Sequence, residues 1–199
     1  NIGGSWTDSL NFTSAEDECE WNSLTSKGQL GVTNCNDDGF ATEIRLGSNN
    51  LTGTFPSEFG QLSTLSVVDI SGNIELSGFL PTTAKLWSTL NTFSFQGCGL
   101  NGTFPQNIGV ATGLEELNGN LNYLVGTMPT EVGRLVNLRL FNLESNGMSG
   151  PLPTEIGLLS SLEVLSLKSN QFSGTIPTTM SGLASLRHAQ LSYNQFGDG

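Results

Sequence analysis

The sequence predicts an elongated α/β solenoid whose stacked coils place short parallel strands on a concave face and turns or 3₁₀ segments on a convex face. The first observation behind this prediction is a regular period. Six prolines recur at intervals of 25, 24, 24, 24 and 24 residues, each three positions after a glycine: Pro56, Pro81, Pro105, Pro129, Pro153 and Pro177. The second is a brief alternation of apolar and polar residues within the periods, as in Ile44/Leu46 and Leu165/Leu167. A period of this length indicates stacked repeats.

Each alternating segment predicts a short strand with one buried face. A single strand cannot hide its apolar side, so successive coils must stack and align their strands in one parallel sheet. Aligned on the prolines, the segments read L-x-x-L-x-L-x-x-N-x-L-x-G-x-h-P-x-x-h-G-x-L, where h is apolar. We expect about seven repeats over residues 41–199, the last incomplete, behind an N-terminal capping segment over residues 1–40.

An asparagine recurs where the chain leaves the strand, at Asn49, Asn73, Asn122, Asn146, Asn170 and Asn194. Its amide carries donors and an acceptor, so stacked copies can satisfy backbone groups of the turns. Cys98 takes this position in the third repeat, where we expect a buried free thiol rather than a nucleophile. An extra residue within 73–76 should bulge outward. Gly119 stands where a core leucine belongs, which predicts a packing defect or a displaced neighbour such as Leu121 in that place.

The composition argues against several classes of function. Seven basic against eighteen acidic residues give a net charge of −11, which repels phosphate backbones and anionic membranes, so nucleic acid is not an expected partner. The chain holds one histidine and none of the common nucleophile, zinc or phosphate-binding motifs. We therefore expect no enzyme, no catalytic residue, no metal site and no cofactor. No apolar run is long enough to cross a bilayer, and we expect a monomer in isolation.

The G-x-h-P-x-x-h-G-x-L extension resembles the plant-type leucine-rich repeat family, which includes receptor-kinase ectodomains and polygalacturonase-inhibiting proteins. The resemblance covers roughly residues 41–199 and implies a leucine-rich repeat solenoid. The front of the chain is similar to that family's N-terminal cap, with Trp6, then Cys19-Glu20-Trp21, then Gly31-Val32-Thr33-Asn34-Cys35. It implies a disulfide between Cys19 and Cys35. About nine residues, 22–30, stand where the family usually has one, which makes this a divergent member.

The resemblance also implies a secreted protein or a cell-surface ectodomain outside the cell. Three N-x-[ST] sequons agree with this location and predict N-glycosylation at Asn11, Asn50 and Asn101. The last repeat stops before its proline, so we expect the natural protein to continue into further repeats with a C-terminal cap or toward a membrane anchor.

In the family, ligands bind the concave sheet. The exposed column between the two buried strand positions is expected to carry binding, with His188 and Tyr193 beside it: Arg45, Asp69, Ser94, Asn118, Asn142, Ser166 and Gln190. Amides and hydroxyls both donate and accept hydrogen bonds, which suits a peptide, a glycan or a protein partner. The alternative is that these are ordinary solvated strand positions.

A second hypothesis rests on threonines two positions before the prolines, at Thr54, Thr103, Thr127 and Thr175. Stacked coils would turn them into a regular array of hydroxyl and methyl groups able to bind ice or a crystalline polymer. Against this, threonine simply suits exposed extended positions. Adhesion or structural assembly in an extracellular matrix is a third hypothesis.

Overall fold

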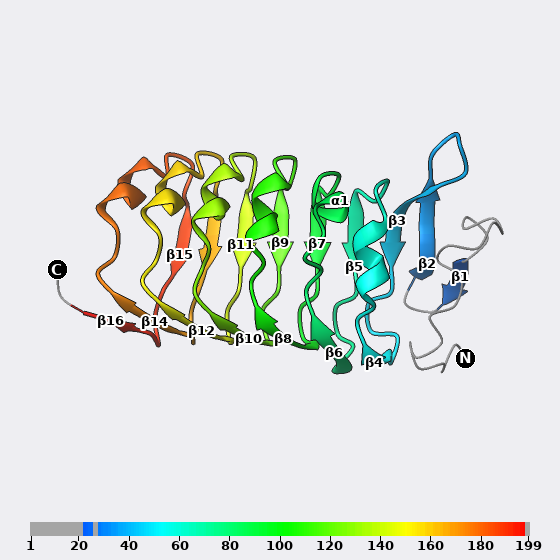
Figure 1. Cartoon of the computed structure of the whole chain (residues 1–199), viewed down its shortest axis with the longest axis horizontal. Helices are drawn as coiled ribbons and strands as arrows, with labels where there is room; N and C mark the ends of the chain where they lie inside the picture. Colours follow the sequence, from blue (N-terminus) through cyan, green and yellow to red (C-terminus); the bar gives the residue numbers. More distant parts are fainter. Residues whose placement is uncertain (1–21, 26–27, 198–199) are drawn as a thin grey trace.

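The computed structural model describes residues 22–25 and 28–197 and shows an elongated solenoid of stacked coils (Figure 1). Its larger sheet has nine strands in this described part of the chain. In spatial order they are β1 (Asn22–Thr25), β2 (Gly28–Cys35), β3 (Ala41–Arg45), β5 (Val67–Asp69), β7 (Thr92–Ser94), β9 (Glu116–Asn118), β11 (Leu140–Asn142), β13 (Val164–Ser166) and β15 (His188–Gln190). From β3 to β15 the pairing is parallel and advances one coil per strand, which confirms the predicted sheet.

A second parallel sheet, which the sequence analysis did not predict, follows the asparagine of each coil. Its strands are β4 (Thr52–Thr54), β6 (Glu75–Phe79), β8 (Gly99–Thr103), β10 (Tyr123–Gly126), β12 (Gly147–Gly150), β14 (Gln171–Gly174) and β16 (Gln195–Phe196). Each strand includes or directly precedes the recurring glycine, which is why the segment looks like a turn in the sequence. Gly78 and Gly102 have φ of 100° and 79°, the left-handed region that other residues avoid.

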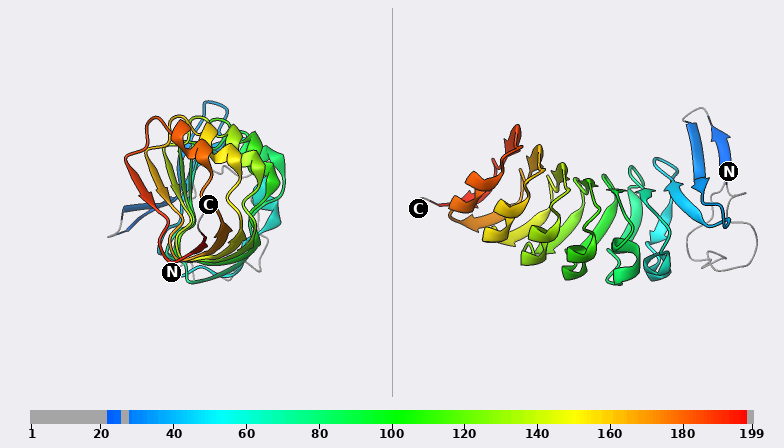
Figure 2. Two further views of the ribbon diagram at one scale, coloured as in Figure 1. Left: turned by 90° about the vertical axis from the view of Figure 1, so that its left-hand side faces the viewer. Right: turned by 90° about the horizontal axis from the view of Figure 1, so that it is seen from above.

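A helical turn follows each proline on the remaining side of the coil. Four-residue α1 (Ala84–Trp87) serves the second coil, and 3₁₀ turns serve the others: η2 (Ser57–Gln61), η3 (Gln106–Val110), η4 (Thr130–Arg134), η5 (Thr154–Leu158) and η6 (Thr178–Gly182). Seen along the solenoid axis, the two sheets and this row of helices enclose the core, and seen from above the helices lie on the outer side of the bend (Figure 2). The larger sheet therefore lines the inner, concave side.

The gap expected at Gly119 is filled from the neighbouring coil. A Cβ placed on Gly119 would lie 2.1 Å from Cζ of Phe95, whose ring occupies the space that a leucine takes elsewhere. Leu121, the residue expected to fill the gap, is 54% exposed and held at φ 56° in the turn, so that expectation was wrong. The Phe95 ring in turn packs against Phe93, with ring centroids 4.9 Å apart.

The asparagine ladder is present and makes two kinds of bond per coil. The Nδ2 of Asn122 donates to the carbonyl of Phe95 in the preceding coil, and its Oδ1 accepts the N–H of Leu100 at 3.1 Å. The same two bonds recur at Asn73 and at Asn170. Each rung therefore joins one coil to the coil before it and satisfies backbone groups that the core would otherwise leave unpaired.

Cys98 keeps one of these two functions and loses the other. Its Sγ donates to the carbonyl of Ile70 at 3.2 Å, which replaces the asparagine donor, and burial raises the pKa of this thiol and so keeps its proton in place. A thiol cannot replace the amide acceptor, which would receive the N–H of Leu76. That N–H instead donates to the carbonyl of Asn73 at 2.9 Å, across a turn that contains the extra residue. Ile74 bulges out of this turn, 79% exposed, as predicted. The insertion and the cysteine thus compensate for each other.

The N-terminal end of the larger sheet is covered by a hairpin. β1 pairs antiparallel with β2, and β2 pairs antiparallel with β3. Residues 22–30, the stretch that departs from the family's cap, form β1 and the start of β2, so the insertion builds additional sheet. Cys35 is disulfide-bonded. Cys19, its expected partner, lies outside the described residues, as do Trp6 and Asn11.

The packing at Gly119 gives a first prediction. Gly119→Ala should destabilise the protein by about 1–3 kcal/mol, because the new methyl group overlaps the Phe95 ring in a closed core. The double variant Gly119→Leu/Phe95→Leu should recover much of this loss, since it restores the usual leucine at both positions. Urea unfolding followed by circular dichroism measures both. Gly113→Ala is the control, because its Cβ would meet nothing closer than 3.8 Å.

The compensation between residues 74 and 98 gives a second prediction. Deleting Ile74 should cost about 1–3 kcal/mol, because the turn that satisfies the buried Leu76 N–H is lost. Adding Cys98→Asn to the deletion should recover most of this cost, since the amide supplies the acceptor found in the other coils. The same unfolding measurement on both single variants and the double variant gives the coupling, and strictly additive effects would contradict the proposed compensation.

Candidate ligand-binding site

The concave sheet brings the predicted column together in strict register. The strand pairings place Arg45 beside Asp69, then continue strand by strand to the far end of the column through Ser94, Asn118, Asn142, Ser166 and Gln190. Ile44 and its equivalents on the other strands point into the core, so the intervening residues face outward. The sequence-predicted residues therefore form one continuous row, which we call the central column.

The central column is less exposed than expected. Arg45 and Gln190 at its ends are exposed, whereas its middle members are half-buried, and Ser166 is only 6% exposed. The expectation that Ser166 is an exposed binding residue was therefore wrong. Its hydroxyl donates to Oε2 of Glu144 at 3.2 Å, and Glu144 is paired with Lys168 at 3.2 Å, so two long side chains border this short one.

Hydrogen bonds hold several of the column's polar side chains in place. Oδ1 of Asp69 accepts the hydroxyl of Ser71 at 2.6 Å, and Oδ1 of Asn142 accepts the N–H of Glu144 at 3.0 Å. Nδ2 of Asn118 donates to Oε1 of Gln96 at 3.0 Å. The buried Oδ1 atoms of Asn118 and Asn120 have no hydrogen-bond partner. The middle of the sheet thus holds ordered amides with unused acceptor capacity.

The structure adds an apolar element that the sequence analysis missed. Val67, Leu140 and Val164 lie on the concave face at the start of β5, β11 and β13, and all three are half-exposed. Leu140 and Val164 are directly paired, which makes a small apolar surface beside Asn142. These residues stand one position before the buried strand residue, and the signal was available in the sequence as an apolar residue at an outward position.

Tyr193 and His188 both lie at the C-terminal end of the face, but in different settings. His188 begins β15 and is exposed. Tyr193 lies in the turn after the strand, at φ 56° and 77% exposed, and not in the central column. The ammonium of Lys168 lies 5.9 Å from the centre of the Tyr193 ring, a cation–π distance. The tyrosine therefore borders the sheet next to the Glu144–Lys168 pair.

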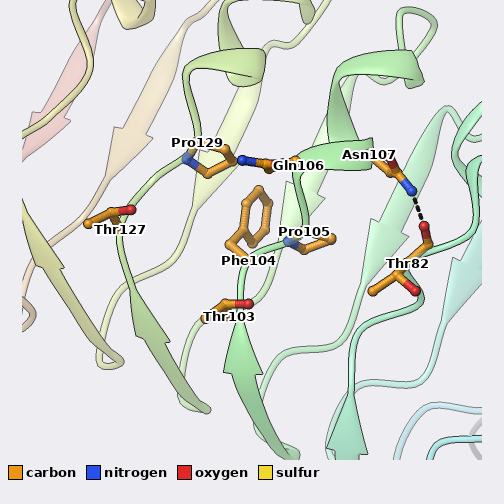
Figure 3. Close-up of a pocket in the computed structure, with 8 residues that line it drawn as sticks. All are labelled: Thr82, Thr103, Phe104, Pro105, Gln106, Asn107, Thr127 and Pro129. Carbon is orange, nitrogen blue, oxygen red and sulfur yellow. Dashed lines mark hydrogen bonds between the residues drawn. The ribbon is translucent and has the colours of Figure 1, made fainter.

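The threonines of the alternative hypothesis lie on the lateral side, at the ends of the second sheet. Thr54, Thr103, Thr127 and Thr175 are exposed. Thr103 and Thr127 line a hollow of about 420 Å³ whose other walls include Pro105, Pro129 and the buried Phe104 (Figure 3). The amide of Asn107 donates to the carbonyl of Thr82 at one edge of this hollow. The threonine surface is thus indented between these two coils.

Thr103 and Thr127 also contribute to coil stacking. A Cβ added to Gly126 would lie 3.1 Å from Cγ2 of Thr103, and one added to Gly150 would lie 2.9 Å from Cγ2 of Thr127. The methyl group of each threonine therefore faces the glycine of the next coil.

The described residues hold no cluster of three or more His, Cys, Asp or Glu side chains arranged for a metal ion. No helix among them has the length and apolar character needed to cross a membrane.

Comparison with known proteins agrees with this architecture. A profile of the Leucine Rich Repeat family matches residues 41–62 and 161–183. A probable leucine-rich repeat receptor-like protein kinase of Arabidopsis thaliana is 34% identical over 106 residues, which cover 48% of this chain and 11% of that relative. Among solved structures, the PEPR1-AtPEP1 complex matches with a TM-score of 0.82 at 28% identity, over 94% of this chain and 25% of that one. The chain belongs to the plant-type leucine-rich repeat family.

A second solved relative of this plant-type repeat chain is the ectodomain of the Arabidopsis receptor kinase HAESA in complex with an N-terminally extended IDA peptide hormone. It matches with a TM-score of 0.68 at 31% identity, over 73% of this chain and 25% of that one. The plant-type repeat chain thus spans a quarter or less of the length of these relatives.

One edge of the concave sheet carries an ionic ladder. Just before β13, Oε1 of Glu163 accepts hydrogen bonds from Nε and a terminal nitrogen of Arg139 at 3.0 and 2.7 Å, and its other oxygen lies 3.4 Å from Arg187. The hydrogen bonds from Arg139, followed by the charges of Arg139 and Arg187, lower the pKa of Glu163 below its ordinary value of 4.5. Three successive coils are joined by these contacts.

The ladder gives a pH prediction. A carboxylate whose pKa is lowered by folding stabilises the protein above its unfolded-state pKa, and this contribution is lost as the pH falls through the lower folded-state value. Glu163→Gln should therefore lower the thermal midpoint slightly at pH 7, and the difference from the wild type should vanish as the pH falls below 4.5. High salt should shrink it at pH 7. Glu75→Gln, at an exposed position without an ion pair, is the control; equal behaviour of both variants would contradict the assignment.

Proposed function

We propose that this chain is part of a non-enzymatic extracellular receptor or binding protein, and that an extended peptide lies across its concave sheet from β5 to β13. The observation that carries the proposal is the pairing of an apolar surface, Leu140 and Val164, with the half-buried amides of Asn118 and Asn142. An apolar surface anchors a side chain, and fixed amides pair with a peptide backbone, which both donates and accepts hydrogen bonds.

The dimensions of the sheet suit a short peptide. Strands in a sheet lie about 4.8 Å apart, so the six steps from β3 to β15 span about 29 Å. An extended chain rises about 3.3 Å per residue, so about nine peptide residues would cover the face. A ligand of this size would contact the central column along its length.

Charge gives the proposed ligand a direction. Arg45 lies 3.3 Å from Glu43, and Lys168 is paired with Glu144, so both ends of the face hold ion pairs. Asp69 between them has no ion pair in the described part of the chain. A basic ligand residue over β5 would complement Asp69, while an apolar ligand residue would lie over β11 and β13. Such complementarity sets the register of a peptide on the sheet.

The relatives support the peptide over other ligands. The HAESA ectodomain was solved with a peptide hormone, and another structural relative is described as the plant peptide hormone receptor RGFR1 in complex with RGF2, at 27% identity and a TM-score of 0.66 over 78% of this chain and 29% of that one. The disulfide at Cys35 supports an extracellular location, because such bonds persist in oxidising compartments.

Other partners remain as outcomes of experiment. A glycan would use the same amides and hydroxyls, without needing Leu140 or Val164. A second protein partner or an extracellular matrix would need a larger contact area than this face alone offers. Binding of ice or a crystalline polymer by the threonine surface is tested separately by thermal hysteresis of the purified chain.

The proposal is tested with an array of synthetic peptides of about nine to fifteen residues, a length set by the span of the sheet, and a parallel array of cell-wall oligosaccharides. Asn142→Arg should weaken binding of any selected peptide by about tenfold or more, because it fills the middle of the face. Gln106→Arg, an exposed position on the opposite side of the coil, is the control and should leave binding unchanged.

The direction of the ligand has its own test. Asp69→Lys should weaken binding of peptides with a basic residue, and exchanging that residue for glutamate should restore it. Binding of oligosaccharides alone, or peptide binding equally affected by Gln106→Arg, would contradict a peptide on the concave sheet.

A further inference from the structure

The outward face of the second sheet carries exposed apolar side chains grouped around one of the sequons. Phe79, Tyr123 and Val125 are 68%, 70% and 47% exposed, although they lie in regular strands. Soluble proteins seldom leave neighbouring large apolar side chains uncovered unless something binds them. Asn101, the first residue of the sequon Asn101-Gly102-Thr103, lies in β8 between the strands that carry the two aromatic residues.

The strand register places both aromatic residues beside the asparagine. Phe79 of β6 and Tyr123 of β10 are the direct cross-strand partners of Asn101, one on each side, in strands that run side by side along the solenoid (Figure 1). Adjacent strands lie about 4.8 Å apart, so the rings flank the amide within one strand spacing. Leu100 and Leu124, next in sequence to Asn101 and Tyr123, are fully buried, which turns the latter two outward.

The Phe79 ring lies directly against the sequon. A Cβ added to Gly102 would come 2.5 Å from Cδ1 and 3.0 Å from Cε1 of this ring. Only a glycine allows the ring to lie so close to the backbone, so the middle residue of the sequon is also what seats the aromatic side chain. The Asn101 side chain is half-exposed and makes no hydrogen bond within the described residues, which leaves its amide nitrogen available.

We propose that Asn101 carries an N-linked glycan whose first sugars lie between the rings of Phe79 and Tyr123 and cover this patch. In the attachment step the Asn101 nitrogen loses a proton and forms a bond to the anomeric carbon of an oligosaccharide. The lipid diphosphate that carried the oligosaccharide leaves with the electron pair of the broken bond. The C–H faces of sugar rings are apolar and pack on aromatic side chains, which gives the two exposed rings a partner.

The second described sequon, at Asn50, has a different setting. Asn50 lies in a turn at φ 53° and lines a hollow of about 410 Å³ with Ile74, and no aromatic residue lines that hollow. It is three strands away from Tyr123 in the sheet order. A glycan at Asn50 therefore serves as an internal comparison for one at Asn101. The proposal requires passage through a secretory pathway but does not depend on what the concave sheet binds.

The two tyrosines of the chain allow a direct test. Tyr123 and Tyr193 are similarly exposed, at 70% and 77%, but only Tyr123 lies beside a sequon. The chain is secreted from insect cells, occupancy at Asn101 is measured by glycopeptide mass spectrometry, and the folded protein is nitrated with tetranitromethane. The rate of nitration at Tyr123 relative to Tyr193 should fall by about threefold or more when Asn101 is glycosylated, because the sugars cover one ring and not the other.

Three variants make the result specific. Asn101→Gln removes the glycan, and Thr103→Val removes the sequon while it keeps the methyl group that faces Gly126. Both should raise the Tyr123-to-Tyr193 ratio to the same value, whereas Asn50→Gln should leave it unchanged. An unoccupied Asn101 in the secreted protein would overturn the proposal, and so would a Tyr123-to-Tyr193 ratio that is the same with and without the glycan, since the sugars would then extend into solvent.

Discussion

A coil of this solenoid cannot bury its own apolar side chains, so each coil is stable only through contact with the coils before and after it. The most specific part of that contact is the ladder of buried amides, in which one side chain donates to a backbone carbonyl of the preceding coil and accepts a backbone N–H from it. These bonds keep successive coils in a constant register. The constant register in turn builds every surface of the molecule, because equivalent residues of all coils then form rows.

The same dependence explains how the chain tolerates departures from its own repeat. At Gly119 the missing side chain is replaced by the Phe95 ring from the coil before. At Cys98 the missing acceptor is replaced by a carbonyl made available by an extra residue in the adjacent turn. In both cases the compensation comes from a neighbouring coil, since the neighbour is the only group of atoms that shares the buried space.

Because the architecture uses nearly all the recurring residues, the specificity of the protein must rest on positions that vary between coils. On the concave sheet these are the central column and the half-exposed apolar pair Leu140 and Val164. On the second sheet they are Phe79 and Tyr123 beside Asn101. The two surfaces lie on different sides of the coil, so a covering glycan on one does not obstruct a ligand on the other (Figure 2).

The sequence by itself determined the solenoid, the sheet from β3 to β15, the ladder, and the register of the central column, because a fixed period translates directly into rows of equivalent positions. Only the tertiary structure decided what fills the Gly119 gap, that Ser166 is covered, that a second sheet exists, and that Phe79 and Tyr123 flank Asn101. Each of these depends on contacts between residues about 22 to 24 positions apart whose side chains differ from coil to coil. A period predicts which positions meet, but the shapes and charges that meet there are settled only when the coils are packed together.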